Sequence, residues 1–194
     1  PKYEKFYKNY GRQLRYGAVA NYGQNVQSLS ELLLYYVDVD KTRTLKEYTD
    51  AMPAEQEKIY YAVGDSVSRT LHLPQAELVR SKGYELLCMT DEVDEFIVQQ
   101  LGTYAEKPFC NIVTDDLGLE SEEERADIEK RESDAKETLD FVRETLGERV
   151  AKVKLSHKLV SAPVCLTTEG GVTLEMERYF RSMPDTGMQP PKAT

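Results

Sequence analysis

The chain has 194 residues, of which 40% are hydrophobic and 30% charged, and its formal net charge is −9. This composition is typical of a globular protein with one large domain or two small ones. The acidic balance argues against a nucleic-acid partner, because phosphate binding requires clustered Lys and Arg side chains.

The chain contains no apolar run close to the ~20 residues that a membrane-spanning helix needs. Its opening residues, PKYEKFYKNYGRQLRYG, are aromatic and basic and lack the apolar core of a secretory signal. We therefore expect a cytoplasmic protein that has no membrane partner.

The three cysteines, Cys88, Cys110 and Cys165, are far apart and never form a CxxC pair. Zinc sites use close pairs of ligands, and free Cys behaves as a small apolar residue. We expect buried free thiols and, since His72 and His157 are isolated, no metal site.

The first 55 residues are predicted to form a helical lead-in. An amphipathic helix is predicted from the helical spacing of Tyr3, Phe6, Tyr7, Tyr10 and Leu14. Ser28 with Glu31 has the pattern of a capping box ahead of a helix that extends to Tyr36, and Thr44 with Glu47 has the same pattern ahead of a helix through Met52.

Residues 56–116 are predicted to form an α/β unit. Strands are expected at 59–63, 84–89 and 109–113, with helical segments over 67–83 and 93–101 between them. Strands that alternate with helices through short links imply a three-strand parallel unit with right-handed crossovers.

Residues 117–149 are predicted to form a long charged helix that connects two portions of the chain. Between residues 120 and 149 there are twelve acidic and six basic residues. Ile128, Leu139, Val142 and Leu146 nevertheless recur at helical spacing, so we expect the helix to pack increasingly toward its C-terminal half.

Residues 150–194 are predicted to be a small α+β portion. Alternating residues from Val153 to Leu159 and the run 164–166 indicate two strands, and residues 172–183 indicate a helix. On that helix Met176, Phe180 and Met183 share one face, flanked by Tyr179. Such a stripe is typical of a core-facing helix, but Met and aromatic residues are also enriched where a surface adapts to varied partners.

Four carboxylates, Asp91, Glu92, Asp94 and Glu95, follow the second predicted strand. Carboxylates are favoured in the first turn of a helix, so we interpret them as helix-start residues rather than as metal ligands. The residues Gly64-Asp65-Ser66 lack the second glycine of a nucleophile turn, and no phosphate-binding loop is present. The sequence therefore predicts no catalytic residue.

Three stretches resemble the heat-shock protein 90 family of chaperones, most of all its bacterial HtpG-like members. They are TLKEYTDAMPAEQEKIYYAVGDS (44–66), KGYELLCMTDEVDEFIVQQL (82–101) and VKLSHKLVSAPVCLTTEGGVTLEMERYFRSM (153–183). The resemblance extends more loosely over nearly the whole chain.

The resemblance implies that the chain is a fragment of an ATP-dependent, dimeric, stress-response chaperone. Residues 1–116 would be the distal part of the middle domain, 117–149 the connecting helix and 150–194 the start of the C-terminal domain. The fragment itself would hold no cofactor, because ATP and Mg²⁺ would bind outside it, and it would not be an enzyme. The helices of the homodimer would also lie outside it.

The resemblance further implies that the partners of this fragment are partly folded client proteins. Its client contacts would be Met176, Tyr179, Phe180 and Met183 on the C-terminal helix, together with the acidic–aromatic pair Glu95 and Phe96.

Two alternatives stay open at this stage. A stand-alone enzyme or small-ligand domain would place its site at the carboxyl ends of the strands, near Gly64, Asp65, Asp91 and Asp94. A purely structural coupling module would bury the Met176/Phe180 stripe in its own domain.

Overall fold

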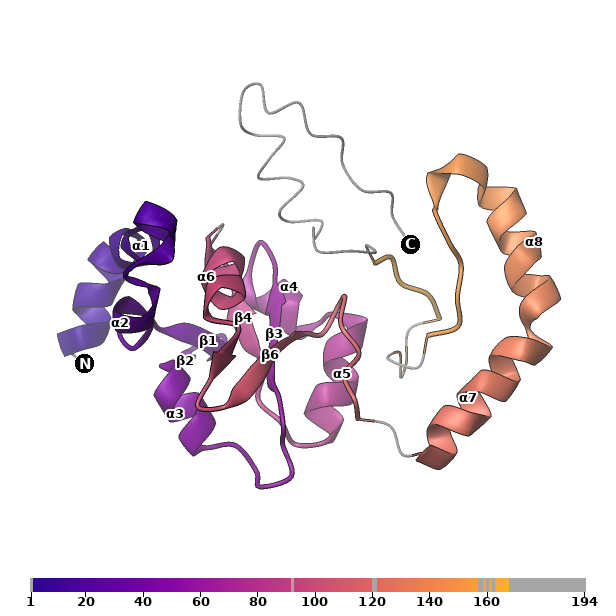
Figure 1. The fold of residues 1–194 in the computed structure, drawn as a ribbon, viewed down its shortest axis with the longest axis horizontal. Coiled ribbons are helices and arrows are strands. Elements are labelled where there is room, and N and C mark those ends of the chain that lie inside the picture. The colour runs from indigo at the N-terminus through magenta and orange to yellow at the C-terminus, as the bar shows by residue number, and fades with distance from the viewer. Residues whose placement is uncertain are drawn as a thin grey trace. The chain divides into compact units, whose positions relative to one another are not determined.

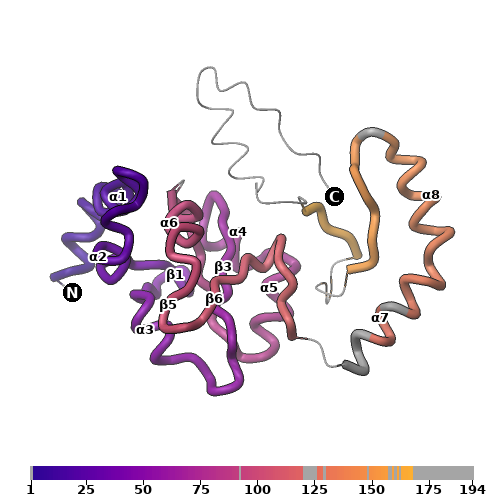
Figure 2. The backbone as a smooth tube through the Cα atoms, in the orientation of Figure 1, coloured from indigo at the N-terminus to yellow at the C-terminus, as the bar shows by residue number. Residues whose placement is uncertain are grey.

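A computed structural model describes residues 2–91, 93–119, 122–156, 159, 161 and 163–167. The chain divides into two compact units, residues 1–112 and 113–194. Figures 1 and 2 trace both units, and each is described here by itself.

A mixed six-stranded sheet forms the centre of the first unit, in the order β2-β1-β4-β3-β6-β5. The strands are β1 (Tyr35–Asp38), β2 (Lys41–Arg43), β3 (Ile59–Val63), β4 (Leu87–Met89), β5 (Thr103–Tyr104) and β6 (Lys107–Asn111). Strand β3 pairs in parallel with β4 and with β6, and the other neighbouring strands pair antiparallel. The predicted α/β character is confirmed.

Six helices accompany the sheet: α1 (Lys2–Gly23), α2 (Val26–Ser30), α3 (Leu45–Asp50), α4 (Val67–Leu71), α5 (Pro74–Ser81) and α6 (Asp94–Leu101). The α4–α5 segment joins β3 to β4, and α6 leads from β4 toward β6. Because these two crossovers run in opposite directions along the sheet, the right-handed rule places them on opposite faces. Figure 1 shows α5 and α6 on either side of the strands.

The core of this unit is built around strand β3. Its first four residues, Ile59 to Ala62, are all buried, as expected for a strand that is covered on both faces. Apolar side chains from α1, α2, α3, β1, β4 and α6 join the same cluster. Cys88 and Cys110 are buried free thiols as predicted, and Cys165 is half-buried. Burial raises the pKa of Cys88 to about 12, which keeps its thiol protonated.

The prediction of a helix from Ser28 to Tyr36 is wrong for the residues after Ser30. Helix α2 begins after Asn25, without a side-chain cap, and ends at Ser30. The chain then enters β1, where Tyr36 pairs with Cys88 of β4. Pairing with the sheet outweighs the local periodicity, since aromatic and β-branched residues suit a strand that is buried on one face. The carboxylate of Glu31 accepts hydrogen bonds from the Tyr104 hydroxyl at 2.8 and 2.9 Å instead of completing a capping box.

The predicted strand boundaries also need correction. The strand predicted at 84–89 is confined to Leu87–Met89, and the one predicted at 109–113 lies at Lys107–Asn111. The shift of the latter reflects a hairpin with β5 whose two loop residues, Ala105 and Glu106, have φ of 48° and 63°. Positive φ at both positions is the signature of a type I′ turn, which usually contains Asn-Gly. Because Ala105-Glu106 stands there instead, the sequence did not indicate this hairpin.

The second unit contains α7 (Glu122–Asp134), α8 (Lys136–Leu146) and a short 3₁₀ turn, Gly147–Arg149. The single long helix predicted here is therefore divided near Ala135. The expected packing of its C-terminal half is not found, because α8 has no buried residue and Phe141 is 67% exposed.

The two strands predicted after Gly147 are also not found. None of the described residues between 150 and 167 is in a strand. The helix predicted at 172–183 lies outside the described residues.

The capping box of α3 provides a direct test of the helix assignments. The Glu47 N–H donates to Thr44 Oγ1 at 3.1 Å, and the Thr44 N–H donates to Glu47 Oε2 at 2.8 Å. We expect Thr44→Ala to lower the free energy of unfolding by about 1 kcal/mol in urea denaturation.

The matched control is Ser28→Ala, at the exposed position where the sequence predicts a box that does not form. Its effect should lie within about 0.5 kcal/mol of zero. Equal losses for Thr44→Ala and Ser28→Ala would contradict this assignment of the two helix starts.

Candidate functional site

The turn that leads into α6 is held by carboxylates that accept hydrogen bonds from backbone N–H groups. The Asp91 N–H donates to Asp94 Oδ2 at 3.2 Å, and the Val93 N–H donates to Asp91 Oδ1 at 3.4 Å. The Asp94 N–H donates to the Asp91 carbonyl at 3.1 Å, which closes the turn. These contacts confirm that Asp91 and Asp94 act at the helix start.

Asp94 also forms a buried ion pair with Arg15 of α1. Arg15 Nε donates to Asp94 Oδ1 at 2.5 Å, and the side chains are 10% and 0% exposed. A second nitrogen of the guanidinium, Nη2, donates to the Leu34 carbonyl at 2.9 Å. The guanidinium lies over the rings of Tyr7 and Tyr35, at 5.3 and 5.6 Å from their centroids. The cation is thus surrounded by an anion, a carbonyl and two π faces.

The surroundings of this pair change its protonation equilibria. Burial raises the pKa of the Asp94 carboxyl above its ordinary value, and the charge and hydrogen bond of Arg15 oppose the rise. Burial likewise raises the pKa of Tyr7 to about 12. Burial also raises the pKa of Tyr35 well above its ordinary value. Both tyrosines therefore stay neutral beside the Arg15–Asp94 ion pair.

The amphipathic pattern predicted for the first helix did not single out Arg15 among its basic residues. The missed signal is its spacing. Arg15 follows Gly11 by four residues and precedes Ala18 by three, and these three residues are the buried ones of α1. A charged residue within an apolar stripe indicates a buried partner.

Glu95 and Phe96 follow Asp94 and have different environments. Glu95 is 2% exposed, and its Oε1 accepts a hydrogen bond at 3.2 Å from Nδ2 of Asn111, a residue of β6 that is 4% exposed. Phe96 is partly buried and packs against the core cluster. The pair predicted as a client contact is thus one buried carboxylate followed by one partly accessible ring. Met176, Tyr179, Phe180 and Met183 lie outside the described residues.

Asp65 and Asp94, two carboxylates of the alternative ligand site, form ion pairs with different arginines. The Gly64 N–H donates to the Met89 carbonyl at 3.0 Å, so β3 and β4 do end at the same edge. Asp65, however, pairs at 2.9 Å with exposed Arg69, whereas Asp94 faces Arg15 inside the unit. Among the described residues there is no group of three or more His, Cys, Asp or Glu side chains that could hold a metal ion.

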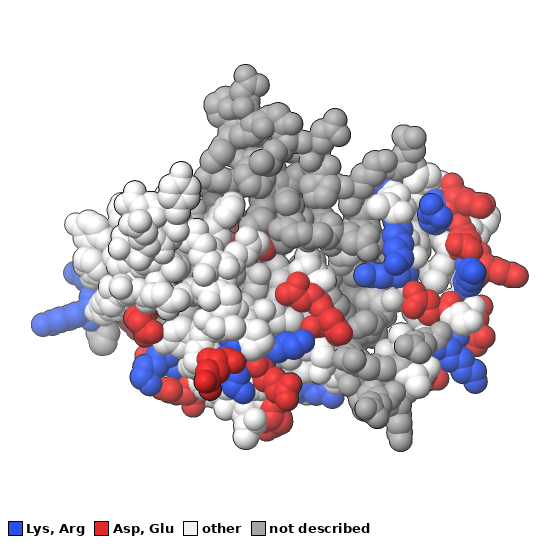
Figure 3. All heavy atoms as spheres, viewed as in Figure 1, with Lys and Arg blue, Asp and Glu red and all other residues white. Residues whose placement is uncertain are grey.

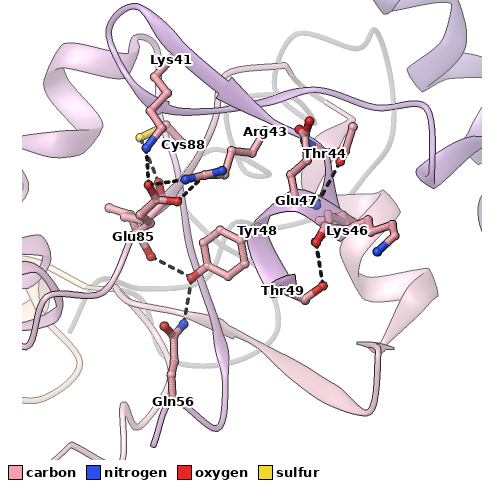
Figure 4. A network of polar contacts seen from close by, with 12 residues as sticks. Lys41, Arg43, Thr44, Lys46, Glu47, Tyr48, Thr49, Gln56, Glu85 and Cys88 are labelled. Carbon is pink, nitrogen blue, oxygen red and sulfur yellow. Dashed lines mark hydrogen bonds and ion pairs between the residues drawn. The ribbon is translucent and has the colours of Figure 1, made fainter. Parts of the chain in front are cut away.

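A second polar network joins β2 and α3 to Glu85, in the segment that leads into β4 (Figure 4). Glu85 accepts from Lys41 Nζ at 2.5 Å and from Arg43 Nε at 2.6 Å. The Tyr48 hydroxyl donates to the Glu85 carbonyl at 2.7 Å and accepts from Gln56 Nε2 at 3.0 Å. Side chains from four segments are therefore linked at one edge of the sheet.

Charged side chains on the face drawn in Figure 3 do not form a basic patch. Lys and Arg lie beside Asp and Glu on the lower part of this face, and the part over α1 and α2 is mostly uncharged. Tyr3, Phe6 and Tyr10 of α1 are 38%, 44% and 53% exposed. Their rings lie next to one another, with centroids 6.1 Å apart for Tyr3 and Phe6 and 5.1 Å apart for Phe6 and Tyr10.

Comparison with known proteins decides the family. The family model described as "Hsp90 protein" matches residues 1–190. The chain belongs to the Hsp90 family. It is 43% identical over 186 residues to the chaperone protein HtpG of Bacillus subtilis. These residues make up 95% of this chain and 30% of that protein. The HtpG proteins of Clostridium perfringens and Oceanobacillus iheyensis are 44% and 45% identical over 184 residues, or 94% of this chain and 29% of each relative.

The Hsp90-family chain therefore spans about 30% of the length of the curated relatives it matches. The predicted resemblance is confirmed, and a stand-alone enzyme or small-ligand domain is not favoured. None of the helices in the described part of the chain is long and apolar enough to cross a membrane.

The buried ion pair of this Hsp90-family chain should be costly to break from one side. We expect Asp94→Ala to lower the free energy of unfolding by about 3–5 kcal/mol, because the Arg15 cation is left buried without its partner. The double variant Arg15→Met/Asp94→Leu removes both charges, so its free energy of unfolding should fall much less in the same urea titration. Equal losses would show that the cost lies in packing rather than in a stranded charge.

Glu85 should make the stability depend on pH. Burial alone would raise the pKa of Glu85, but hydrogen bonds from Arg43 and Lys41 outweigh it and hold the pKa below the ordinary 4.5. A lowered pKa in the folded state contributes stability above the unfolded-state pKa, and this stability is lost as the pH falls through the folded-state pKa.

At pH 7 we expect Glu85→Gln to be less stable than wild type by about 0.5–1 kcal/mol. The difference is small because about a third of the Glu85 side chain is exposed to solvent, which screens its charge. The difference between the two proteins should shrink as the pH falls below 4.5. A difference that stays constant from pH 7 to pH 3 would contradict the charge-based explanation.

Proposed function

We propose that this chain is the part of an ATP-dependent, dimeric Hsp90-family chaperone that contacts partly folded client proteins. The observation that carries the proposal is the 43% identity over 95% of the chain to a chaperone protein HtpG. ATP and Mg²⁺ would bind in other parts of the whole protein, so this chain supplies binding rather than catalysis. A cytoplasmic location belongs to the same proposal.

Within the whole chaperone we assign residues 1–116 to the distal part of the middle domain, with the three-strand parallel unit of β4, β3 and β6 as its centre. Residues 117–149 form the charged connection to the C-terminal domain, and residues 150–194 form the start of that domain. The homodimer is made by segments outside this chain. Weak contacts on two arms would then add up through a high effective concentration.

Two surfaces are proposed to contact clients. The first is the stripe of Met176, Tyr179, Phe180 and Met183, whose flexible and aromatic side chains can adapt to different partners. The second is the Phe96 ring on α6, which is partly buried and offers apolar surface at the edge of a well-packed core. Glu95, its acidic neighbour in the expected pair, is buried. In both cases an apolar side chain covers hydrophobic surface that a partly folded client exposes to water.

The test is a titration of reduced, carboxymethylated α-lactalbumin, a permanently unfolded protein, into this chain. We expect saturable binding, and we expect Phe96→Ala and Met176→Ser/Phe180→Ser each to raise the dissociation constant at least about fivefold. Removing apolar contact area accounts for the direction, and circular dichroism establishes that each variant is folded.

The matched control is Phe141→Ser, which removes a phenylalanine that is 67% exposed on α8 and belongs to neither proposed set of contact residues. Its dissociation constant should stay within about twofold of wild type. No binding by the wild-type chain, or equal weakening by all three variants, would contradict the proposed client contacts.

A further inference from the structure

We propose that Glu95 does not touch clients but acts, together with Asp94, as a positioning residue that holds the first turn of α6 and so fixes the Phe96 ring at the surface. The inference rests on the proposed function, because it assigns roles within the proposed α6 contact. It differs from the expectation drawn from family resemblance, in which Glu95 and Phe96 meet the client together.

The burial of Glu95 is the first argument. A side chain that meets a partner by charge must be reached by that partner, and Glu95 is only 2% exposed. Its Oε1 accepts from Asn111 Nδ2 at 3.2 Å, and Asn111 is itself 4% exposed on β6. The carboxylate is therefore occupied with a neighbouring strand of its own unit, and a buried acceptor of this kind is costly to release.

The second argument is that two consecutive carboxylates hold the same turn from different sides. Asp94 binds Arg15 of α1 at 2.5 Å, and Glu95 binds Asn111 of β6. Successive residues of an α-helix point about 100° apart, so these two contacts fix both the position of the helix start and its rotation about its axis. With Asp94 and Glu95 turned inward, the direction of the next side chain, Phe96, is determined.

A fixed ring is useful for binding. Ordering a side chain at an interface costs about 0.5–1.5 kcal/mol of conformational entropy, and a ring that is held before the client arrives avoids that loss. Phe96 already packs against the core cluster, while part of it stays accessible. The carboxylates thus act on clients through Phe96 and not through their own charge.

Conservative and truncating variants separate the two roles of Glu95. Glu95→Gln removes the charge but keeps an oxygen that can accept from Asn111, whereas Glu95→Ala removes both. For a positioning residue, Glu95→Gln should bind carboxymethylated α-lactalbumin within about twofold of wild type, and Glu95→Ala should bind roughly fivefold more weakly. Asn111→Ala, which removes the donor, should resemble Glu95→Ala. Equal weakening by Glu95→Gln and Glu95→Ala would overturn the proposal and return Glu95 to the client surface.

A second readout follows the ring without any client. With 4-fluorophenylalanine at position 96, the ¹⁹F resonance should shift or broaden in Glu95→Ala and in Asp94→Asn, and should stay at the wild-type position in Glu95→Gln. Glu85→Gln is the control, because it weakens an ion pair of the same unit at a different edge of the sheet. An unchanged resonance in Glu95→Ala, or the same shift in Glu85→Gln, would overturn the positioning role.

The two readouts also separate this proposal from the proposed function. If Phe96→Ala binds the unfolded protein as wild type does, the client contact on α6 is wrong, yet the ¹⁹F resonances still decide whether Glu95 and Asp94 position the ring. If Phe96→Ala weakens binding and Glu95→Gln does too, the contact stands and the positioning role of Glu95 fails. Asp94→Asn provides the same ¹⁹F test should Glu95→Ala not fold.

Discussion

Taking the Arg15 guanidinium and the Asp94 carboxylate out of water costs several kcal/mol per ion, and the first unit is arranged to offset that cost. Arg15 Nε and Asp94 Oδ1 lie 2.5 Å apart. The Leu34 carbonyl accepts from the Arg15 Nη2, and the Asp91 N–H donates to the second carboxylate oxygen of Asp94. The rings of Tyr7 and Tyr35 cover the cation. Helix α1, the approach to β1 and the start of α6 are thereby joined at one point. Each of these segments depends on the other two, because displacing any one of them exposes or strands a charge.

The parallel pairing of β3 with β4 and β6 explains why the proposed contact lies where it does. A parallel neighbour can be reached only by a crossover, so the chain must leave the carboxyl end of β4 and return along α6 before it enters β6. The start of α6 therefore lies next to a sheet edge, between α1 and the end of β6. This placement brings Arg15 and Asn111, which are far apart in the sequence, to the neighbouring residues Asp94 and Glu95.

The sequence predicted those features of the fold that local chemistry decides. The Thr44/Glu47 box and the strand β3 were each found from a pattern of a few residues. The similar Ser28/Glu31 pattern gave a wrong prediction, because tertiary pairing of β1 with β4 decides the structure there. Phe96 was predicted as a site residue from family resemblance. The contact of Arg15 with Asp94 was not predicted, because it spans 79 residues and no local pattern encodes it.

The burial of two acidic side chains also bears on how a client would be attracted. Long-range steering depends on exposed charge, and a carboxylate that is paired or hydrogen-bonded inside a unit contributes little to the outer field. Asp94 and Glu95 are therefore poor candidates for steering basic client segments, although the acidic sequence around them suggests that role. The negative excess of the chain lies instead in residues 120–149, with twelve acidic against six basic residues, and α8 within this stretch has no buried residue. Attraction and contact would then be separate tasks, with charge on the connecting segment and apolar surface at Phe96.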